Sequence, residues 1–108
     1  MTVTLNPDRR QIELNGRAVR LQPQVFTIAT ILFDRPRRLV STEWIFQVLW
    51  GNDPNGGPLT ARRAVNVQVC HLRAALRELG ADCQITTEHG VGYRLDLAGS
   101  AEPLRVAA

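Results

Sequence analysis

No segment limits the possible folds of this chain more than the stretch from Thr60 to Leu79, which lies between a loop rich in glycine and proline and a glycine at position 80. At 100° per residue the larger aliphatic side chains of this stretch fall on a single stripe, and they are Val65, Val69, Leu72, Leu76 and Leu79. Such spacing predicts a helix with one buried side, and Gly80 suits its C-terminal cap. We therefore expect a long helix over about 60–79.

The first 21 residues predict a small antiparallel sheet. Apolar and polar residues alternate over 2–5, 11–14 and 17–20, as in strands with one buried face. Asn15-Gly16 separates the second and third of these runs and is a strong signal for a tight hairpin. We expect three strands with one face turned to a core.

Two shorter helices are expected before the long one. Pro23 suits a first helical turn, and apolar residues repeat at helical spacing from there to about Asp34. Ser41 or Thr42 would cap a second helix, which Gly51 would end. The chain therefore predicts three helices in all.

The end of the chain predicts a second hairpin. Its strands are expected at 84–87 and 93–95, around a turn at 88–92 that contains two glycines. Residues 38–40 indicate only a short extended link between the first two helices. After the hairpin, 98–108 has little to pack, and we expect this tail to be flexible.

Length and composition favour one domain. A chain of 108 residues with 44% apolar residues fits one α/β (α+β) domain over 1–97, followed by the tail. No apolar run is long enough for a membrane span or a signal peptide, so we expect a cytoplasmic protein without a membrane partner. Cys70 and Cys83 are too few for a disulfide scaffold and lack the spacing of a zinc site. We expect reduced thiols, no metal and no other cofactor.

The charged residues give a weak indication of a partner. Thirteen basic residues against ten acidic ones leave a net charge of +3, and every basic residue is an arginine. Arginine is well suited to bind phosphates and guanine edges, because its planar fork donates two parallel hydrogen bonds. No Ser-His-Asp order, paired acidic motif or phosphate-binding loop is present, so we expect no enzymatic activity.

The side of the long helix opposite its buried stripe mixes small, apolar, hydrogen-bonding and cationic side chains. Its members are Arg63, Val67, Cys70, His71 and Ala74, flanked by Asn66, Arg73 and Arg77. A solvated face usually carries more long charged side chains, whereas small side chains allow a helix to lie deep in the major groove of DNA. The alternative is that this face packs on another protein or on the chain's own N-terminal sheet.

Individual roles follow from the chemistry of this face. Val67 or Ala74 would contact a thymine methyl group, as small apolar side chains do. Arg63, Asn66 or His71 would form hydrogen bonds with base edges. Arg73 and Arg77, nearer the rim, would bind phosphates.

The order of helix, turn, helix and glycine-containing hairpin is that of a winged helix-turn-helix, in which the hairpin is the wing. Over residues 3 to 96 the sequence resembles the DNA-binding domain of the OmpR/PhoB family of bacterial response regulators. The resemblance depends on several segments in a fixed order, namely Val19-Arg20-Leu21, Phe26, Leu39-Val40-Ser41, Val48 to Gly51, Arg63 to Arg73 and Thr87 to Arg94. Of these, the last is the most specific.

The resemblance implies sequence-specific binding to double-stranded DNA and regulation of transcription. The third helix, about 60–79, would lie in the major groove, and the wing, about 84–95, at the minor groove. From the helix face and the resemblance together, the residues predicted to bind DNA are Arg63, Asn66, Val67, Gln68, Cys70, His71, Arg73, Arg77, Thr87, His89 and Tyr93. The loop between the second and third helices is the predicted surface for RNA polymerase, through Trp50, Asn52, Asp53 and Asn55.

The sequence departs from the family's usual pattern at several positions, where charged or basic residues are common. The differing residues are Asn66, Gln68, Cys70, His71, Ala74, Ala75, Glu88 and His89. The loss of basic residues removes charge that would attract phosphates, so we expect weaker electrostatic binding than in a typical relative.

Several alternatives remain open. The main one is a protein-interaction module of the same fold that binds RNA polymerase or another regulator. On DNA we expect two or more copies, as a homodimer or in tandem, and association with the nucleoid. The 108 residues leave no room for a receiver domain, so the chain is either an excised domain or a free-standing regulator. Met1 directly before the first strand favours the second case.

Overall fold

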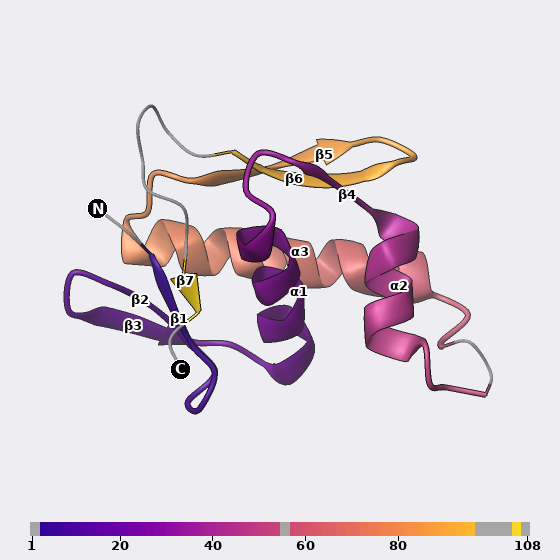
Figure 1. The fold of residues 1–108 in the computed structure, drawn as a ribbon, viewed down its shortest axis with the longest axis horizontal. Helices are drawn as coiled ribbons and strands as arrows, with labels where there is room; N and C mark the ends of the chain where they lie inside the picture. The colour runs from indigo at the N-terminus through magenta and orange to yellow at the C-terminus, as the bar shows by residue number, and fades with distance from the viewer. Residues whose placement is uncertain (1–2, 55–56, 97–104, 107–108) are drawn as a thin grey trace.

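The computed structural model describes residues 3–54, 57–96 and 105–106, in which two small sheets and three helices enclose one hydrophobic core (Figure 1). Helix α1 lies between the two sheets, and α3 runs behind it across the molecule. The elements in chain order are β1 (Thr4–Asn6), β2 (Gln11–Leu14), β3 (Arg17–Arg20), α1 (Pro23–Asp34), β4 (Leu39–Ser41), α2 (Thr42–Trp50), α3 (Ala61–Leu79), β5 (Gln84–Glu88), β6 (Gly92–Asp96) and β7 (Arg105–Val106). This confirms the predicted α/β winged-helix architecture.

The N-terminal sheet is antiparallel over β1, β2 and β3, as the alternation predicts. In β2, Ile12 and Leu14 are buried, whereas Gln11 and Glu13 are only partly covered. Asn15 and Gly16 both adopt a positive φ, of 52° and 81°, which is the geometry that a tight hairpin turn requires. The Asn-Gly signal is therefore confirmed by the backbone.

A further strand, β7, joins this sheet from the end of the chain. Arg105–Val106 pairs in parallel with Thr4 and Leu5 of β1, so the strand order is β3-β2-β1-β7. Of the tail predicted to be flexible over 98–108, the structure describes only these two residues, so the prediction stays untested. The pairing satisfies backbone groups of β1 that would otherwise lie unpaired at the edge of the sheet.

The three helices have the predicted limits. In α2 the Ser41 hydroxyl accepts a hydrogen bond from the backbone N–H of Trp44 at 3.1 Å, so Ser41 is the N-cap. Helix α3 ends at Gly80, whose φ of 76° is the left-handed conformation expected of a C-cap. All five aliphatic residues of the predicted stripe are buried, and Ala75 joins them.

The C-terminal sheet has three strands in the order β4-β6-β5, where the sequence predicts a two-stranded hairpin. Residues 38–40, predicted to be only an extended link, overlap β4 at 39–41, which pairs with β6. The two backbones meet closely at Gly92, where a Cβ atom would lie 2.0 Å from the carbonyl oxygen of Val40. Glycine is therefore required at this position by the approach of the neighbouring strand.

The start of α2 is also attached to this sheet. The backbone N–H of Thr42 donates to the carbonyl oxygen of Val91 at 2.9 Å, and the Thr42 hydroxyl donates to the same oxygen at 3.3 Å. We call β5, β6 and the turn between them the wing, residues 84–96. The wing is thus fixed both to β4 and to the first residue of α2.

Candidate nucleic-acid interface

The outward face of α3 is open to solvent in the described part of the molecule. Val67 lies on it with 45% of its surface exposed. The other exposed members are Arg63, Asn66, Cys70, His71, Ala74 and Arg77. No described segment covers this face, which excludes the alternative that it packs on the chain's own N-terminal sheet.

A cleft of about 620 Å³ lies between the first turns of α3 and the wing. Its lining brings together two groups that the sequence analysis treats separately. The helix contributes Arg63 and Asn66, and the wing contributes Thr87, His89 and Tyr93. The cleft therefore joins helix and wing into one surface.

Arg62 also lines this cleft and was missed by the sequence analysis. It is exposed at the first turn of α3, next to Arg63. On the helical wheel it lies toward the edge of the buried stripe, so the periodicity gives no sign that it faces the wing. Two adjacent guanidinium groups make this end of the cleft attractive to a phosphate.

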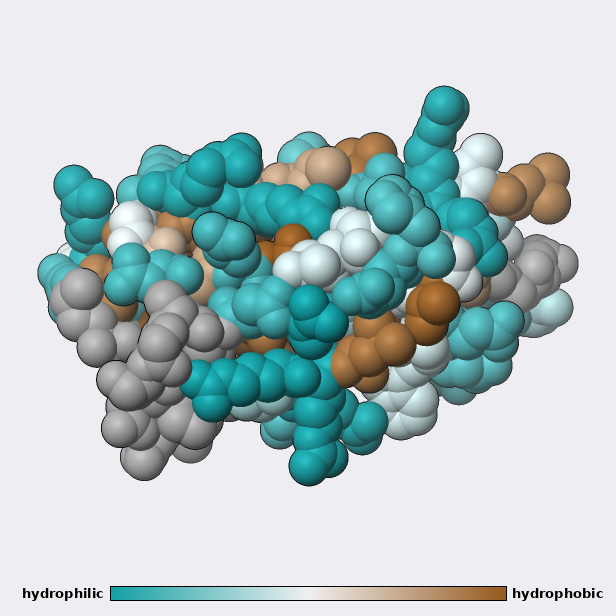
Figure 2. Space-filling model, turned by 90° about the horizontal axis from the view of Figure 1, so that it is seen from above, coloured by the Kyte–Doolittle hydropathy of each residue, from teal (hydrophilic) through white to brown (hydrophobic). Residues whose placement is uncertain are grey.

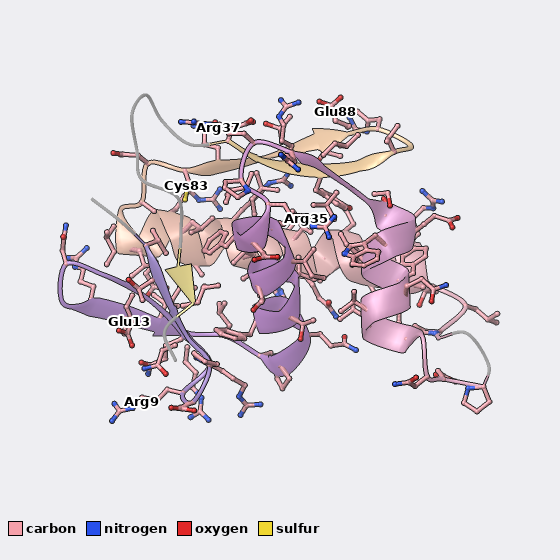
Figure 3. The ribbon with its side chains drawn as sticks, viewed as in Figure 1. Arg9, Glu13, Arg35, Arg37, Cys83 and Glu88 are labelled. Atoms are coloured by element: carbon pink, nitrogen blue, oxygen red, sulfur yellow. The ribbon has the colours of Figure 1, made fainter. Side chains whose placement is uncertain are left out.

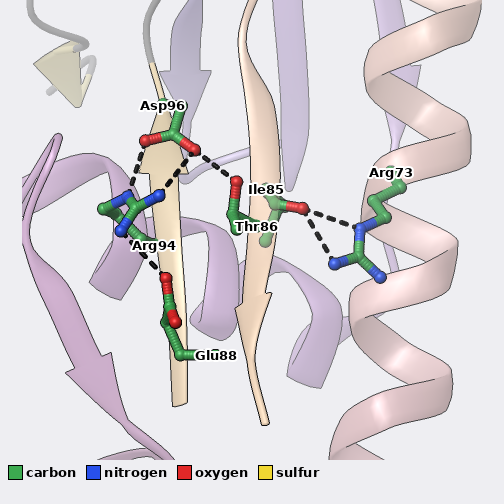
Figure 4. Close-up of polar contacts among 6 residues, drawn as sticks. All are labelled: Arg73, Ile85, Thr86, Glu88, Arg94 and Asp96. Atoms are coloured by element: carbon green, nitrogen blue, oxygen red, sulfur yellow. Dashed lines mark hydrogen bonds and ion pairs between the residues drawn. The ribbon is translucent and has the colours of Figure 1, made fainter.

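Arg73 binds the wing and is not a free cation. Its Nε and Nη2 donate to the carbonyl oxygen of Ile85 at 3.0 and 2.8 Å, and Nη2 also donates to the Thr87 hydroxyl at 2.7 Å (Figure 4 shows the bonds to Ile85). From the sequence, a phosphate contact is predicted for Arg73. The structure instead places this guanidinium on β5, where it connects the helix to the wing.

Gln68 is likewise turned away from the outward face. Its side-chain amide donates to the Oε1 atom of Gln24 in α1. The residue is partly buried, and its own Oε1 has no partner among the described atoms. The predicted DNA contact of Gln68 stays untested, and its side chain lies between α3 and α1.

Tyr93 is buried, with 6% of its surface exposed, yet it lines the cleft. Burial raises the pKa of its hydroxyl, and the nearby charge of Arg73 partly opposes this shift. The hydroxyl is therefore protonated at neutral pH and is available as a hydrogen-bond donor. Tyr93 also pairs with Val40 across β6 and β4, which fixes its backbone.

His89 lies exposed at the tip of the wing, as predicted. The following Gly90 has a φ of 78°, a conformation that favours glycine and permits the sharp turn. The backbone N–H of Val91 donates to the carbonyl oxygen of Glu88 at 3.0 Å and closes that turn. The tip therefore presents an imidazole on an ordered hairpin.

The outer face of the wing carries an ion-pair network. The Nη1 atom of Arg94 lies 3.0 Å from the Glu88 carboxylate, and its Nε lies 2.7 Å from the Asp96 carboxylate (Figure 4). The Thr86 hydroxyl donates to the second oxygen of Asp96. Hydrogen bonds from Arg94 and Thr86 lower the pKa of Asp96, and the same contact raises the pKa of Arg94.

His71 and Cys70 lie next to each other but face different surroundings. His71 lines a shallow groove of about 280 Å³ beside Arg20, Gln22 and Glu78, away from the wing. Cys70 is exposed near the middle of the outward face. Within the described ranges, no three His, Cys, Asp or Glu side chains are grouped to hold a metal ion.

The loop after α2 is partly anchored to the core. Trp50 is half-buried, and its ring lies 6.0 Å from that of Phe46. Gly57 has a φ of 92°, and a Cβ atom there would approach the Trp50 ring to 2.8 Å. Asn52 and Asp53 are exposed, whereas Asn55 lies outside the described residues.

No helix in the described ranges is both long and apolar enough to cross a membrane.

Residues 16–95 match the family model described as "Transcriptional regulatory protein, C terminal". The chain belongs to this family, which comprises domains of transcriptional regulators and not enzymes. It is homologous to the C-terminal effector domains of OmpR/PhoB-type response regulators, as the sequence motifs predict.

Particular relatives agree with this assignment. The chain is 29% identical to the heme response regulator HssR of Staphylococcus aureus strain Newman over 94 aligned residues. This aligned stretch covers 87% of the chain. It spans 40% of the length of the curated relatives it matches.

Solved structures show the same fold. The C-terminal domain of the nisin resistance regulator NsrR is 30% identical, with a TM-score of 0.73 over 90% of this chain and 94% of that one. The DNA-binding domain of Bacillus subtilis CssR is 25% identical, with a TM-score of 0.70 over 87% of this chain and 99% of that one. The AdeR DNA-binding domain, solved in complex with an intercistronic region, is 21% identical with a TM-score of 0.69 over 90% and 96% of the two chains and shows the fold alone.

Proposed function

We propose that this domain binds double-stranded DNA in a sequence-specific manner and thereby regulates transcription. The observation that carries the proposal is the outward face of α3, which is exposed, is rich in small and hydrogen-bonding side chains and continues into an arginine-lined cleft beside the wing. A helix with such a face fits the major groove, and the wing then reaches the adjacent minor groove. The similarity to the DNA-binding domain of Bacillus subtilis CssR supports this function.

Residues on the open part of this surface have distinct roles in the proposal. Arg63 and Asn66 donate hydrogen bonds to base edges, and Val67 contacts a thymine methyl. Cys70 and Ala74 are small enough to let the helix approach the bases. His71 and Arg77, nearer the C-terminal half of α3, bind bases or phosphates at the rim.

The wing supplies the remaining contacts. Arg62, Thr87 and Tyr93 bind a phosphate at the mouth of the cleft, where Arg73 holds the Thr87 hydroxyl in place. His89 enters the minor groove from the wing tip. Because many residues on the surface are uncharged, we propose a weaker salt dependence than a more basic winged helix would show.

Assembly and partners form a finer part of the proposal. Two or more copies bind repeated half-sites in the nucleoid, within the cytoplasm. RNA polymerase binds the loop after α2, through the exposed Asn52 and Asp53 and through Asn55, while Trp50 anchors the start of that loop to the core.

A protein-interaction module is the second candidate, and one observation favours it. On α2, Trp44 and Val48 lie one helical turn apart and expose 45% and 43% of their surfaces. Exposed apolar residues on neighbouring turns are typical of a protein-binding face.

Selection from a pool of random duplexes tests the proposal. We expect enrichment of one short sequence, occurring as spaced half-sites. The variant Arg63→Ala with Asn66→Ala should then lose most of its affinity for the selected duplex and keep its melting temperature. A pool that shows no enrichment would reject the DNA-binding function and favour the protein-interaction module.

A further inference from the structure

Glu88 is the one acidic residue of the described chain that lines the cleft between α3 and the wing. It stands there beside Arg62, Arg63 and His89, on the surface proposed to receive DNA phosphates. A free carboxylate at this place would repel phosphates and compete for the arginines. The orientation of Glu88 therefore affects how well this surface attracts DNA.

The side chain of Glu88 is directed away from α3 by the alternation of β5. Thr87 faces the helix and binds Arg73, so Thr86 and Glu88 project from the opposite, outer face of the sheet. Figure 3 shows Glu88 on that outer side of the wing. Figure 2, which views the molecule from this side, shows a surface that is mainly hydrophilic.

The strand register explains why Arg94 is the partner of Glu88. Directly opposite Glu88 is Gly92, which has no side chain, and Arg94 pairs with Thr86. Arg94 is thus the diagonal neighbour of Glu88, a separation that a long side chain can span. The resulting contact is 3.0 Å between Arg94 Nη1 and Glu88 Oε1.

Arg94 is itself held in place from the other side. Its Nε donates to Asp96 at 2.7 Å, and the Thr86 hydroxyl binds the same carboxylate. The side chains of Arg94, Glu88 and Asp96 are 35%, 43% and 38% exposed. Ion pairs as exposed as these contribute little to folding stability. A gain in stability therefore does not explain why four side chains form this network.

We infer that Arg94 is a positioning residue for DNA binding, which holds the Glu88 carboxylate on the outer face of the wing and neutralises it there. This inference rests on the proposed DNA-binding function. Without Arg94, the Glu88 side chain is free to turn toward the cleft, and the wing loses one positive charge. Both changes weaken the attraction between the wing and a phosphate backbone.

The test measures binding of a fluorescein-labelled duplex, recovered by the wild-type protein from random-site selection, by anisotropy at several salt concentrations. We expect Arg94→Ala to lower the affinity about tenfold at low salt. The slope of log affinity against log salt concentration should become shallower by about one. Glu88→Gln should raise the affinity a few-fold. The double variant should regain most of the affinity that Arg94→Ala loses, because no Glu88 carboxylate is left to turn toward the cleft, and the missing positive charge should keep it below Glu88→Gln.

Asp96→Asn is the matched control. It removes the other carboxylate that binds Arg94 and leaves the Glu88 pair intact, so it should bind the duplex at least as tightly as the wild type. Circular dichroism and thermal melting of each variant check that the wing is folded. Arg94→Lys, which keeps the charge, should lose less affinity than Arg94→Ala.

Two results would overturn the inference while leaving the proposed function intact. One is unchanged affinity in Arg94→Ala. The other is a double variant as weak as Arg94→Ala, which would show that Arg94 contacts DNA directly. If selection with the wild-type protein enriches no duplex, the proposed function fails before any variant is made, and the inference fails with it.

Discussion

The guanidinium of Arg73 lies 2.7 Å from the hydroxyl oxygen of Thr87, so a residue near the middle of α3 is bonded to the strand that leads into the wing tip. Two further hydrogen bonds join the same guanidinium to the carbonyl oxygen of Ile85. The helix is therefore bonded directly to the wing, beside the cleft that lies between them.

Replacing Arg73 by alanine should therefore destabilise the fold. Hydrogen bonds from a charged donor to partly buried acceptors contribute about 1.5–3 kcal/mol, and we expect a loss of about 2 kcal/mol. Urea unfolding followed by circular dichroism measures this change. A variant as stable as the wild type would show that these bonds do not hold the wing.

Arg63→Ala should weaken DNA binding and leave the stability of the fold nearly unchanged. The side chain is exposed on the outward face of α3, so unfolding free energy should change by less than about 0.5 kcal/mol. Loss of a base-edge contact should cost about 1–3 kcal/mol of binding to the selected duplex. Arg17→Ala, which removes the same charge from β3 in the N-terminal sheet, is the control and should keep its affinity.

His89→Ala should weaken DNA binding by about tenfold or less. The imidazole lies at the wing tip, where the minor groove offers a pattern that mainly distinguishes A·T from G·C pairs. The loss should be larger on duplexes with A·T-rich flanks, measured by anisotropy on matched duplexes that differ only in the flanks. Equal losses on both would indicate that His89 does not read the minor groove.

The two cysteines should react at different rates. Burial raises the pKa of the Cys83 thiol above its ordinary value, so little thiolate forms there, whereas Cys70 is exposed. Iodoacetamide should modify Cys70 first in the folded protein, as mass spectrometry of tryptic peptides would show. Bound DNA should slow this reaction, and protection of Cys83 alone would contradict the proposed position of α3.

Acid should weaken the contribution of Asp96 to stability. Its pKa in the folded protein is below the ordinary value of 3.8, because Arg94 and Thr86 bind the carboxylate. The contribution is therefore complete above pH 3.8 and is lost as the pH falls through the folded pKa. Because the side chain is 38% exposed, we expect Asp96→Asn to cost less than about 1 kcal/mol at pH 7. In urea unfolding, the difference in unfolding free energy between variant and wild type should shrink as the pH falls below 3.8, and a difference that grows in acid would contradict the assignment.

The helix limits and the first hairpin were predictable because their signals are local. Pro23, Ser41 and Gly80 each fix the backbone at one helix end, and Asn15-Gly16 fixes a turn, whatever the rest of the chain does. Strands β4 and β7 were not predictable in this way. They are two or three residues long, and each pairs with a strand far away in the sequence.

The site was predictable in outline for a similar reason. A helical wheel gives the direction of each α3 side chain. It does not show which strand or helix lies beside each edge of the outward face. Arg63, Val67 and Cys70 point straight outward and are exposed as predicted. Arg73 and Gln68 lie at opposite edges, where they bind the wing and α1.

The contact between Thr42 and Val91 has a consequence for how the wing behaves. Two hydrogen bonds from one buried residue tie the turn of the hairpin to the base of α2. A tip held in this way is already in its bound shape, so little backbone freedom is given up when a complex forms. Changes of affinity in wing variants will then reflect the lost contacts between the wing and DNA. A partner that binds α2 will meet the same rigid unit of helix and wing that DNA meets.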